Sequence, residues 1–115
     1  MTNERPIYIQ IIEDIKKDIL IGKYLANDRI PSVRELANNY KANPNTCMKA
    51  LQILEDMGLI ITNSTNGKFI TDNYLLIESM KDDMKKVFLN NILKEAEELK
   101  IDKFELAKAI EKGFW

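Results

Sequence analysis

The chain of 115 residues contains no histidine and a single cysteine, Cys47, and these absences exclude several kinds of function. Ordinary zinc and copper sites are built from histidine and cysteine ligands, so we expect neither a metal centre nor a cofactor. One cysteine also excludes an intramolecular disulfide. Acid–base catalysis most often uses histidine, and no glycine-rich phosphate loop or activated nucleophile is recognisable. We therefore do not expect an enzyme.

Long apolar runs and an export signal are also missing. No stretch approaches the roughly 18 apolar residues that a membrane-spanning helix needs. The first residues, Met1 to Arg5, lack the basic and apolar regions of a signal peptide. We therefore expect a cytoplasmic protein with no membrane contact, long enough for one compact domain or for a small domain with an appendage.

An excess of either charge is absent as well. The chain has 17 Lys and Arg against 18 Asp and Glu, a net charge of −1. Proteins that bind nucleic acid usually carry a basic patch, which here would have to come from the local arrangement of Arg34, Lys41, Lys49 and Lys68. The balanced sequence predicts only modest non-specific affinity for nucleic acid.

Residues 30–58 predict two short helices joined by a tight polar turn. The first begins with a capping box, in which Ser32 and Glu35 bond to each other's backbone. The second opens with Asn43 as its N-cap and Pro44 at its first position, where the missing N–H costs nothing. This order is typical of a helix-turn-helix, whose second helix meets DNA base edges with its N-terminal residues.

The segments on either side extend this motif into a winged helix. Residues 6–22 predict a helix, because apolar side chains recur there every three or four positions. Residues 23–29 indicate a loop. After the second helix, two β-prone runs, 59–62 and 68–71, enclose a polar turn that ends at Gly67. We expect these runs to form a β-hairpin wing.

Residues 75–115 predict a separate helical segment. Its long helix, expected over residues 74–100, is apolar around much of its circumference, which requires burial on more than one side. A short helix follows, beginning at Asp102 and ending near Lys112. About 40 residues cannot bury a ligand-binding core alone, so we expect this segment to pair two chains. The expected dimer contact is a stripe of apolar side chains: Ile77, Met80, Met84, Phe88 and Ile92.

The run Ile-Pro-Ser-Val-Arg-Glu-Leu-Ala at residues 30–37 resembles the hallmark of the GntR family of bacterial transcription regulators. Asn-Pro-Asn-Thr at 43–46 resembles its small YtrA-type subfamily, and similarity extends over most of residues 6–71. Many GntR members have Ser-Arg where this chain has Asn43-Pro44, so their base preference does not transfer. The resemblance implies a sequence-specific regulator of transcription.

The expected fold is therefore mainly α with a small β-hairpin wing. A winged helix-turn-helix over residues 1–74 is followed by a two-helix dimerisation segment over residues 75–115. A homodimer would bind double-stranded DNA at a palindromic operator, with half-sites one helical turn or a multiple apart. Repression by occupying a promoter is the simplest mechanism.

Arg34 is the first expected DNA contact, and the resemblance implies this role. A cation in the first turn of a helix is disfavoured by the helix dipole, which favours an external anion as its partner. Arginine is suited to both phosphate and guanine. The alternative is a salt bridge to Asp28 or Glu35.

The second helix and the wing supply the other expected contacts. Asn45 can bond adenine, Thr46 can touch a thymine methyl group or a phosphate, and Lys49 can reach guanine or a phosphate. The alternative is that the first two only start the helix and that the lysine is solvated. In the wing, Gly67 would supply a positive φ and Lys68 would reach a phosphate. The full expected set is Ser32, Arg34, Asn43, Asn45, Thr46, Lys49, Gly67 and Lys68.

Other interpretations stay open. The near-neutral charge also suits a winged-helix protein-interaction module without specific DNA binding, and a ligand-sensing or small enzymatic domain is a third interpretation. A small-molecule effector would sit between the two regions or at the dimer seam, and no residue identifies it. Cys47 is expected to be a packed thiol, since reactive cysteines need an exposed electropositive setting. The methionines lie mostly at core spacing and suggest packing.

Overall fold

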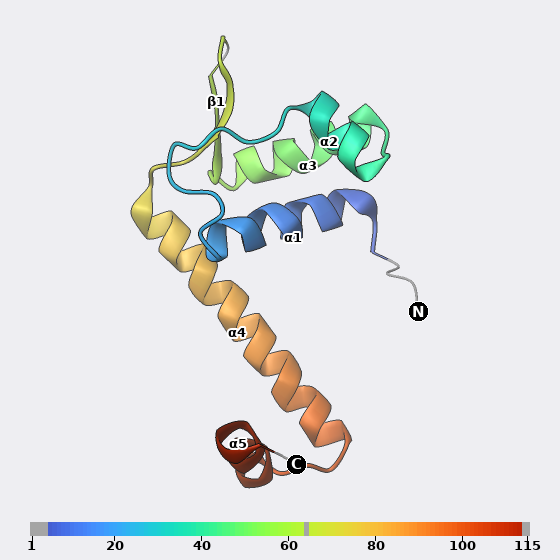
Figure 1. Ribbon diagram of the computed structural model, residues 1–115, viewed down its shortest axis with the longest axis vertical. Helices are drawn as coiled ribbons and strands as arrows, with labels where there is room; N and C mark the ends of the chain where they lie inside the picture. Colours follow the sequence, from blue (N-terminus) through green and yellow to red (C-terminus); the bar gives the residue numbers. More distant parts are fainter. Residues whose placement is uncertain (1–4, 64, 114–115) are drawn as a thin grey trace. The chain divides into compact units, whose positions relative to one another are not determined.

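The computed structural model describes residues 5–63 and 65–113, and the chain divides into two compact units, Met1–Lys81 and Asp82–Trp115. The boundary falls inside a helix and lies seven residues beyond the end of the region 1–74 expected from the sequence. The elements, coloured along the chain in Figure 1, are α1 (Ile7–Leu20), α2 (Val33–Tyr40), α3 (Pro44–Asp56), β1 (Ile60–Asn63), β2 (Gly67–Ile70), α4 (Tyr74–Glu98) and α5 (Lys103–Lys112). The expected fold class, mainly α with a β-hairpin, is confirmed.

The core of the first unit lies between α1 and α3. The isoleucines of α1 that repeat at helical spacing, including Ile11, Ile15 and Ile19, are buried, as the periodicity predicts. α1 packs along α3, and α3 also contacts α2 and β1 (Figure 1). α3 is therefore the central helix of this unit, and only one of its faces is left for other contacts.

The ends of α2 and α3 are fixed by the expected caps. Ser32 Oγ accepts a hydrogen bond from the Glu35 N–H at 3.1 Å, and Glu35 Oε1 accepts one from the Ser32 N–H at 2.9 Å. Asn43 Oδ1 accepts from the Asn45 N–H at 2.8 Å. The turn between the helices passes through Lys41 in the left-handed region, with φ of 51°. The helix-turn-helix predicted from the sequence is confirmed.

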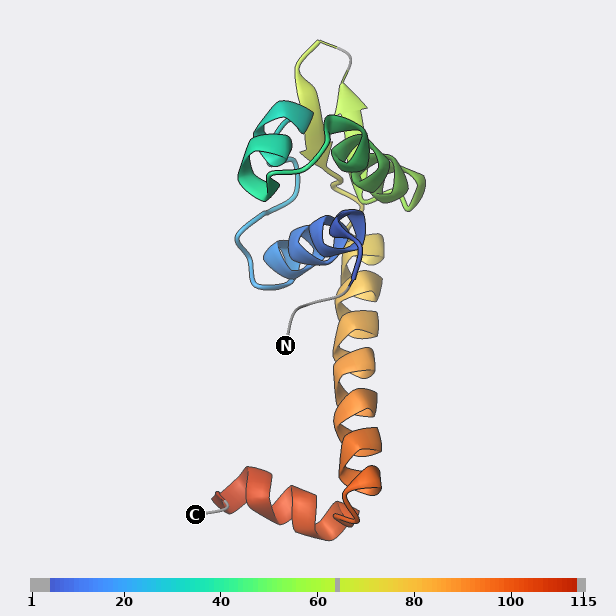
Figure 2. The same ribbon diagram turned by 90° about the vertical axis from the view of Figure 1, so that its right-hand side faces the viewer.

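The hairpin follows α3 and projects beyond the helices of this unit in both views (Figures 1 and 2). β1 and β2 are antiparallel, with Ile60 opposite Ile70 and Thr62 opposite Lys68. Residue 64, in the expected polar turn, lies outside the described residues. Gly67 has φ of 104°, a conformation that favours glycine, as expected for this turn.

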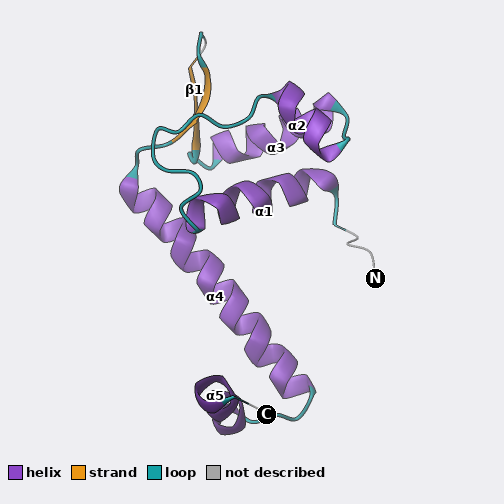
Figure 3. Cartoon of the chain, in the orientation of Figure 1, coloured by secondary structure: helices purple, strands orange, loops and turns teal. Residues whose placement is uncertain are grey.

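The segment expected to be only a loop also pairs with the hairpin. The Ile70 N–H donates to the Asp28 carbonyl at 2.8 Å, and the Ile30 N–H donates to the Lys68 carbonyl at 3.0 Å. This segment is drawn as loop beside the strands in Figure 3, because it forms only an isolated bridge, Arg29 to Phe69. This pairing could not be foreseen, since so short a stretch cannot show a strand's alternation of apolar and polar residues.

The beginning of α4 contributes to the first unit. Ile77 and Met80, two residues of the expected dimer stripe, are buried in their own chain. Leu76 reaches the end of α3, where a Cβ atom on Gly58 would lie 3.1 Å from Leu76 Cδ2. This part of α4 therefore closes the winged-helix unit.

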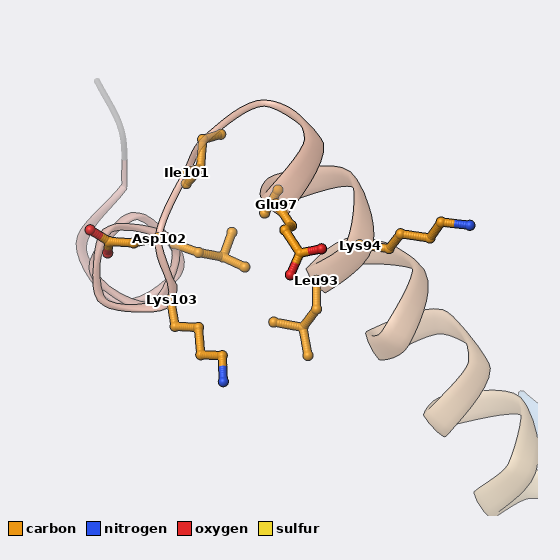
Figure 4. A pocket seen from close by; sticks show the side chains of 8 residues that line it. Leu93, Lys94, Glu97, Ile101, Asp102 and Lys103 are labelled. Carbon is orange, nitrogen blue, oxygen red and sulfur yellow. The ribbon is translucent and has the colours of Figure 1, made fainter.

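The second unit, from Asp82 onward, consists of the rest of α4 and α5. Asp102 caps α5 as expected, with its Oδ1 accepting from the Glu105 N–H at 2.8 Å. A groove of about 450 Å³ lies between the two helices (Figure 4), where Leu93 points towards α5 and Lys94 points away from it. Among the described residues of this unit, only Ala96 is a buried apolar residue. The burial expected for the apolar circumference of α4 is thus not supplied by the unit itself.

Candidate nucleic-acid interface

α3 has two faces with the same helical spacing and opposite environments. Its buried stripe is Cys47, Ala50, Leu51 and Leu54. The opposite stripe, which we call the open face of α3, is exposed and consists of Asn45, Met48, Lys49 and Gln52. Because the core uses only the first stripe, the second is free to contact another molecule.

The N-terminal end of α3 is accessible. Asn43, Pro44 and Asn45 are exposed, and Thr46 is half-buried. The capping oxygen of Asn43 is occupied by the Asn45 N–H, but the amide nitrogen of Asn43 can still donate. The same holds at the start of α2, where Ser32 Oγ accepts from Glu35 while its O–H can donate outward. Each of these two residues can cap its own helix and, at the same time, donate a hydrogen bond to an external acceptor.

Arg34 lies in the first turn of α2 with an exposed side chain. Neither alternative partner pairs with it: Asp28 Oδ2 accepts from the Leu25 N–H at 2.8 Å, and Glu35 is held in the capping box. Within residues 5–63 and 65–113 no ion pair to Arg34 is formed. The guanidinium is therefore available for an anion from outside the chain.

Lys49 is positioned rather than merely solvated. Its ammonium lies 4.0 Å from the centroid of the Tyr8 ring, within the range of a cation–π interaction. Tyr8 lies in α1, where apolar side chains repeat at helical spacing, and is half-buried. The sequence did not reveal its second role, because this contact joins residues far apart in the chain.

The Lys68 side chain is bound by two other side chains of the same chain. Its Nζ lies 2.7 Å from Glu55 Oε1 and 2.8 Å from Thr62 Oγ1, and its side chain is 26% exposed. Hydrogen bonds from Lys68 and Thr62 to the Glu55 carboxylate, together with the Lys68 charge, lower the pKa of Glu55. The structure thus joins Lys68 to the C-terminal part of α3, whereas the sequence suggested that it reaches a phosphate.

Two residues of the open face were missed from the sequence. The expectation that the methionines are packed is wrong for Met48, whose side chain is 53% exposed. Gln52 is also exposed and bonds to Asp56 Oδ1 at 2.9 Å. The signal for Met48 was its position, since it lies three residues after Asn45 and four before Gln52, off the buried stripe of Cys47, Ala50, Leu51 and Leu54.

Cys47 is fully buried, and this burial raises the pKa of its thiol. The expectation of a packed thiol is confirmed. In the part of the chain that the structure describes, no three His, Cys, Asp or Glu side chains come together in a way that could hold a metal ion. No helix there has the length and apolarity needed to cross a bilayer.

The residues expected at the dimer contact are spread over different environments. Ile77 and Met80 are buried in their own chain, and Met84 and Ile92 are half-buried. Phe88 is 63% exposed. Of the five, Phe88 has the most surface to offer to a partner.

Comparison with known proteins identifies the family. The family model described as bacterial regulatory proteins, gntR family, matches residues 7–70, from α1 to the end of β2. The chain belongs to the gntR family. This gntR-family chain is 32% identical over 108 residues to an uncharacterized HTH-type transcriptional regulator, YhcF of Bacillus subtilis, covering 94% of the chain and 89% of YhcF. It is 47% identical over 68 residues to the HTH-type transcriptional repressor YtrA of the same organism, covering 59% of the chain and 52% of YtrA.

Solved structures of other proteins share the fold. A GntR family transcriptional regulator from Listeria monocytogenes matches with a TM-score of 0.88 and 34% identity, covering 97% of this chain and 98% of that one. The DNA-binding domain of AraR, solved in complex with operator ORX1, matches with a TM-score of 0.57 and 28% identity, covering 62% of this chain and 92% of that one. The gntR-family chain is thus a transcription regulator with a DNA-binding domain and not an enzyme.

Proposed function

We propose that this regulator is a cytoplasmic repressor that occupies a palindromic operator as a homodimer. The observation that carries the proposal is the exposed N-terminal end of α3, together with the exposed Arg34 of α2, which forms no ion pair among the described residues. YtrA is named a transcriptional repressor, and the AraR domain is named in complex with an operator, which supports the same role here.

In this proposal α3 enters the major groove with its open face towards the bases. Asn45 offers an amide that matches the adenine edge, and Met48 offers an apolar side chain for a thymine methyl group. Lys49, held over Tyr8, adds a cation near phosphate or guanine. Arg34 neutralises a backbone phosphate or bonds a guanine from the first turn of α2.

The second unit supplies the dimer contact in this proposal. Its described residues bury no large apolar side chain, and segments this small rarely fold without added support. A second copy of the chain has the same apolar surface, so pairing of the two copies would cover both apolar surfaces at once. The exposed apolar residues available for this contact are Val87, Phe88, Leu89, Leu93, Leu99, Phe104 and Ile110.

The α4–α5 groove belongs to the same surface. Four apolar residues and four charged residues line it, and the apolar ones are Leu93, Ala96, Ile101 and Leu106. We infer that the partner copy covers it. A small-molecule effector bound at this seam would act by changing the distance between the two recognition helices, because only one distance fits the two half-sites.

Titration of the full chain against DNA tests the proposal. Fluorescence anisotropy would compare a duplex from the promoter of the chain's own operon with a random duplex of equal length, between about 50 and 200 mM salt. We expect the promoter duplex to bind at least about 10³ times more tightly, with affinity falling steeply as salt rises. Equal and weak binding to both duplexes would instead favour a protein-interaction module.

A further inference from the structure

Arg29 lies at the base of the wing and is anchored there by its backbone. It forms a bridge with Phe69, and the N–H of the next residue, Ile30, donates to the Lys68 carbonyl at 3.0 Å. Its side chain lies directly against the hairpin: a Cβ atom on Gly67 would come within 3.2 Å of Arg29 Nε and 3.7 Å of Arg29 Cζ. The absence of a side chain at Gly67 is therefore what leaves room for the guanidinium.

No carboxylate of the described residues forms an ion pair with this guanidinium. The Arg29 side chain is exposed. Its charge does reach Glu35, whose pKa is lowered mainly by hydrogen bonds from Ser32 and further by Arg29. However, the Glu35 carboxylate is occupied by the capping box, so the cation at Arg29 has no carboxylate paired directly with it in the described part of the chain.

Lys68, one residue before Phe69 in β2, offers the contrast within the wing. Its ammonium is bound by Glu55 and Thr62 and is mostly covered. The two cations of the wing region are therefore not equivalent. Lys68 is paired with Glu55, whereas Arg29 forms no ion pair among the described residues.

We propose that Arg29, and not Lys68, is the wing-side cation that binds a phosphate of the DNA backbone. The inference rests on the proposed function and adds a contact to it. A guanidinium presents several N–H donors in a planar fork that suits two oxygens of one phosphate. Because the backbone of Arg29 is tied to β2 and its side chain lies against Gly67, less freedom is lost on binding than for a lysine on a mobile loop.

The test compares three single-charge variants of the full chain: Arg29→Gln, Lys68→Gln and, as a control outside the helix-turn-helix and the hairpin, Lys17→Gln, an exposed residue in the last turn of α1. Affinity for the promoter duplex and for a random duplex is measured over a range of salt concentrations. Each phosphate contact contributes about 0.9 to the slope of log affinity against log salt concentration.

We expect Arg29→Gln to reduce this slope by about 0.9 per protomer and to lower the affinity for the promoter duplex and for the random duplex by the same factor. Lys68→Gln and Lys17→Gln should leave the slope unchanged, and Arg29→Lys should keep most of it. Thermal melting checks that each variant is folded. If Arg29→Gln does not fold, the slope is compared between Arg29→Lys and the unmodified chain.

An unchanged slope in Arg29→Gln, or a reduced slope in Lys68→Gln alone, would overturn the inference. These outcomes differ from failure of the proposed function, in which the unmodified chain itself would not prefer its promoter.

Discussion

Among single residues, Arg34 is placed so that a role in binding can be separated from a role in stability. It has no ion-pair partner in the described part of the chain and is exposed. Arg34→Ala should weaken operator binding by about 1–3 kcal/mol in each half-site. Anisotropy measures the affinity, and thermal melting should show a change of stability within about 0.5 kcal/mol. A large drop in melting temperature would show that the arginine is structural.

The Glu55–Lys68 pair leads to a prediction about pH. The pKa of Glu55 is lowered from its ordinary value of 4.5 by the bonds from Lys68 and Thr62. A carboxyl whose folded-state pKa is lowered stabilises the fold above its unfolded pKa, and this stabilisation disappears as pH falls through the folded pKa. Both carboxylate and ammonium are about a quarter exposed, so the effect is modest.

Urea unfolding of Glu55→Gln and of the unmodified chain would measure this effect. We expect the variant to be less stable by about 1 kcal/mol near neutral pH. The difference should shrink once the pH falls below about 4.5, as the carboxylate takes up a proton. A difference that is the same at both ends of this range would mean that the charge of Glu55 is not responsible.

Among the helices and strands, the cap of α3 combines stability with DNA recognition. Asn43→Ala removes the bond to the Asn45 N–H and should cost about 1 kcal/mol of stability. Asn43→Asp keeps a capping oxygen and should leave stability nearly unchanged, because Asn and Asp are similar N-caps. The new negative charge should nevertheless weaken operator binding. If the aspartate variant binds as well as the unmodified chain, Asn43 does not lie near the DNA.

The sequence predicted the elements whose signals are local. The capping box of Ser32 and Glu35, the start of α3 at Pro44 and the buried stripe of α1 all depend on residues within a few positions of one another. The ion pair of Lys68 could not be foreseen, because its partner Glu55 lies 13 residues away on another element. The same reason explains why the approach of Arg29 to Gly67 had no sequence signal.

For the protein as a whole, the proposed dimer depends on the second unit. Phe88→Glu places a charge on a large exposed apolar residue of α4 and should convert the dimer to monomers, since a buried unpaired charge is very costly. Sedimentation equilibrium measures the oligomeric state. The matched control is Asn91→Glu, an exposed polar residue of the same helix. Unaltered sedimentation of Phe88→Glu would place the contact elsewhere.

The division of α3 into two stripes also bears on how such a regulator diversifies. Cys47, Leu51 and Leu54 hold the domain together, while Asn45 and Met48 are not part of the core. Changes on the open face therefore carry little penalty in folding. Over generations, this lineage can acquire a new target gene by altering a few surface positions while inheriting the same scaffold.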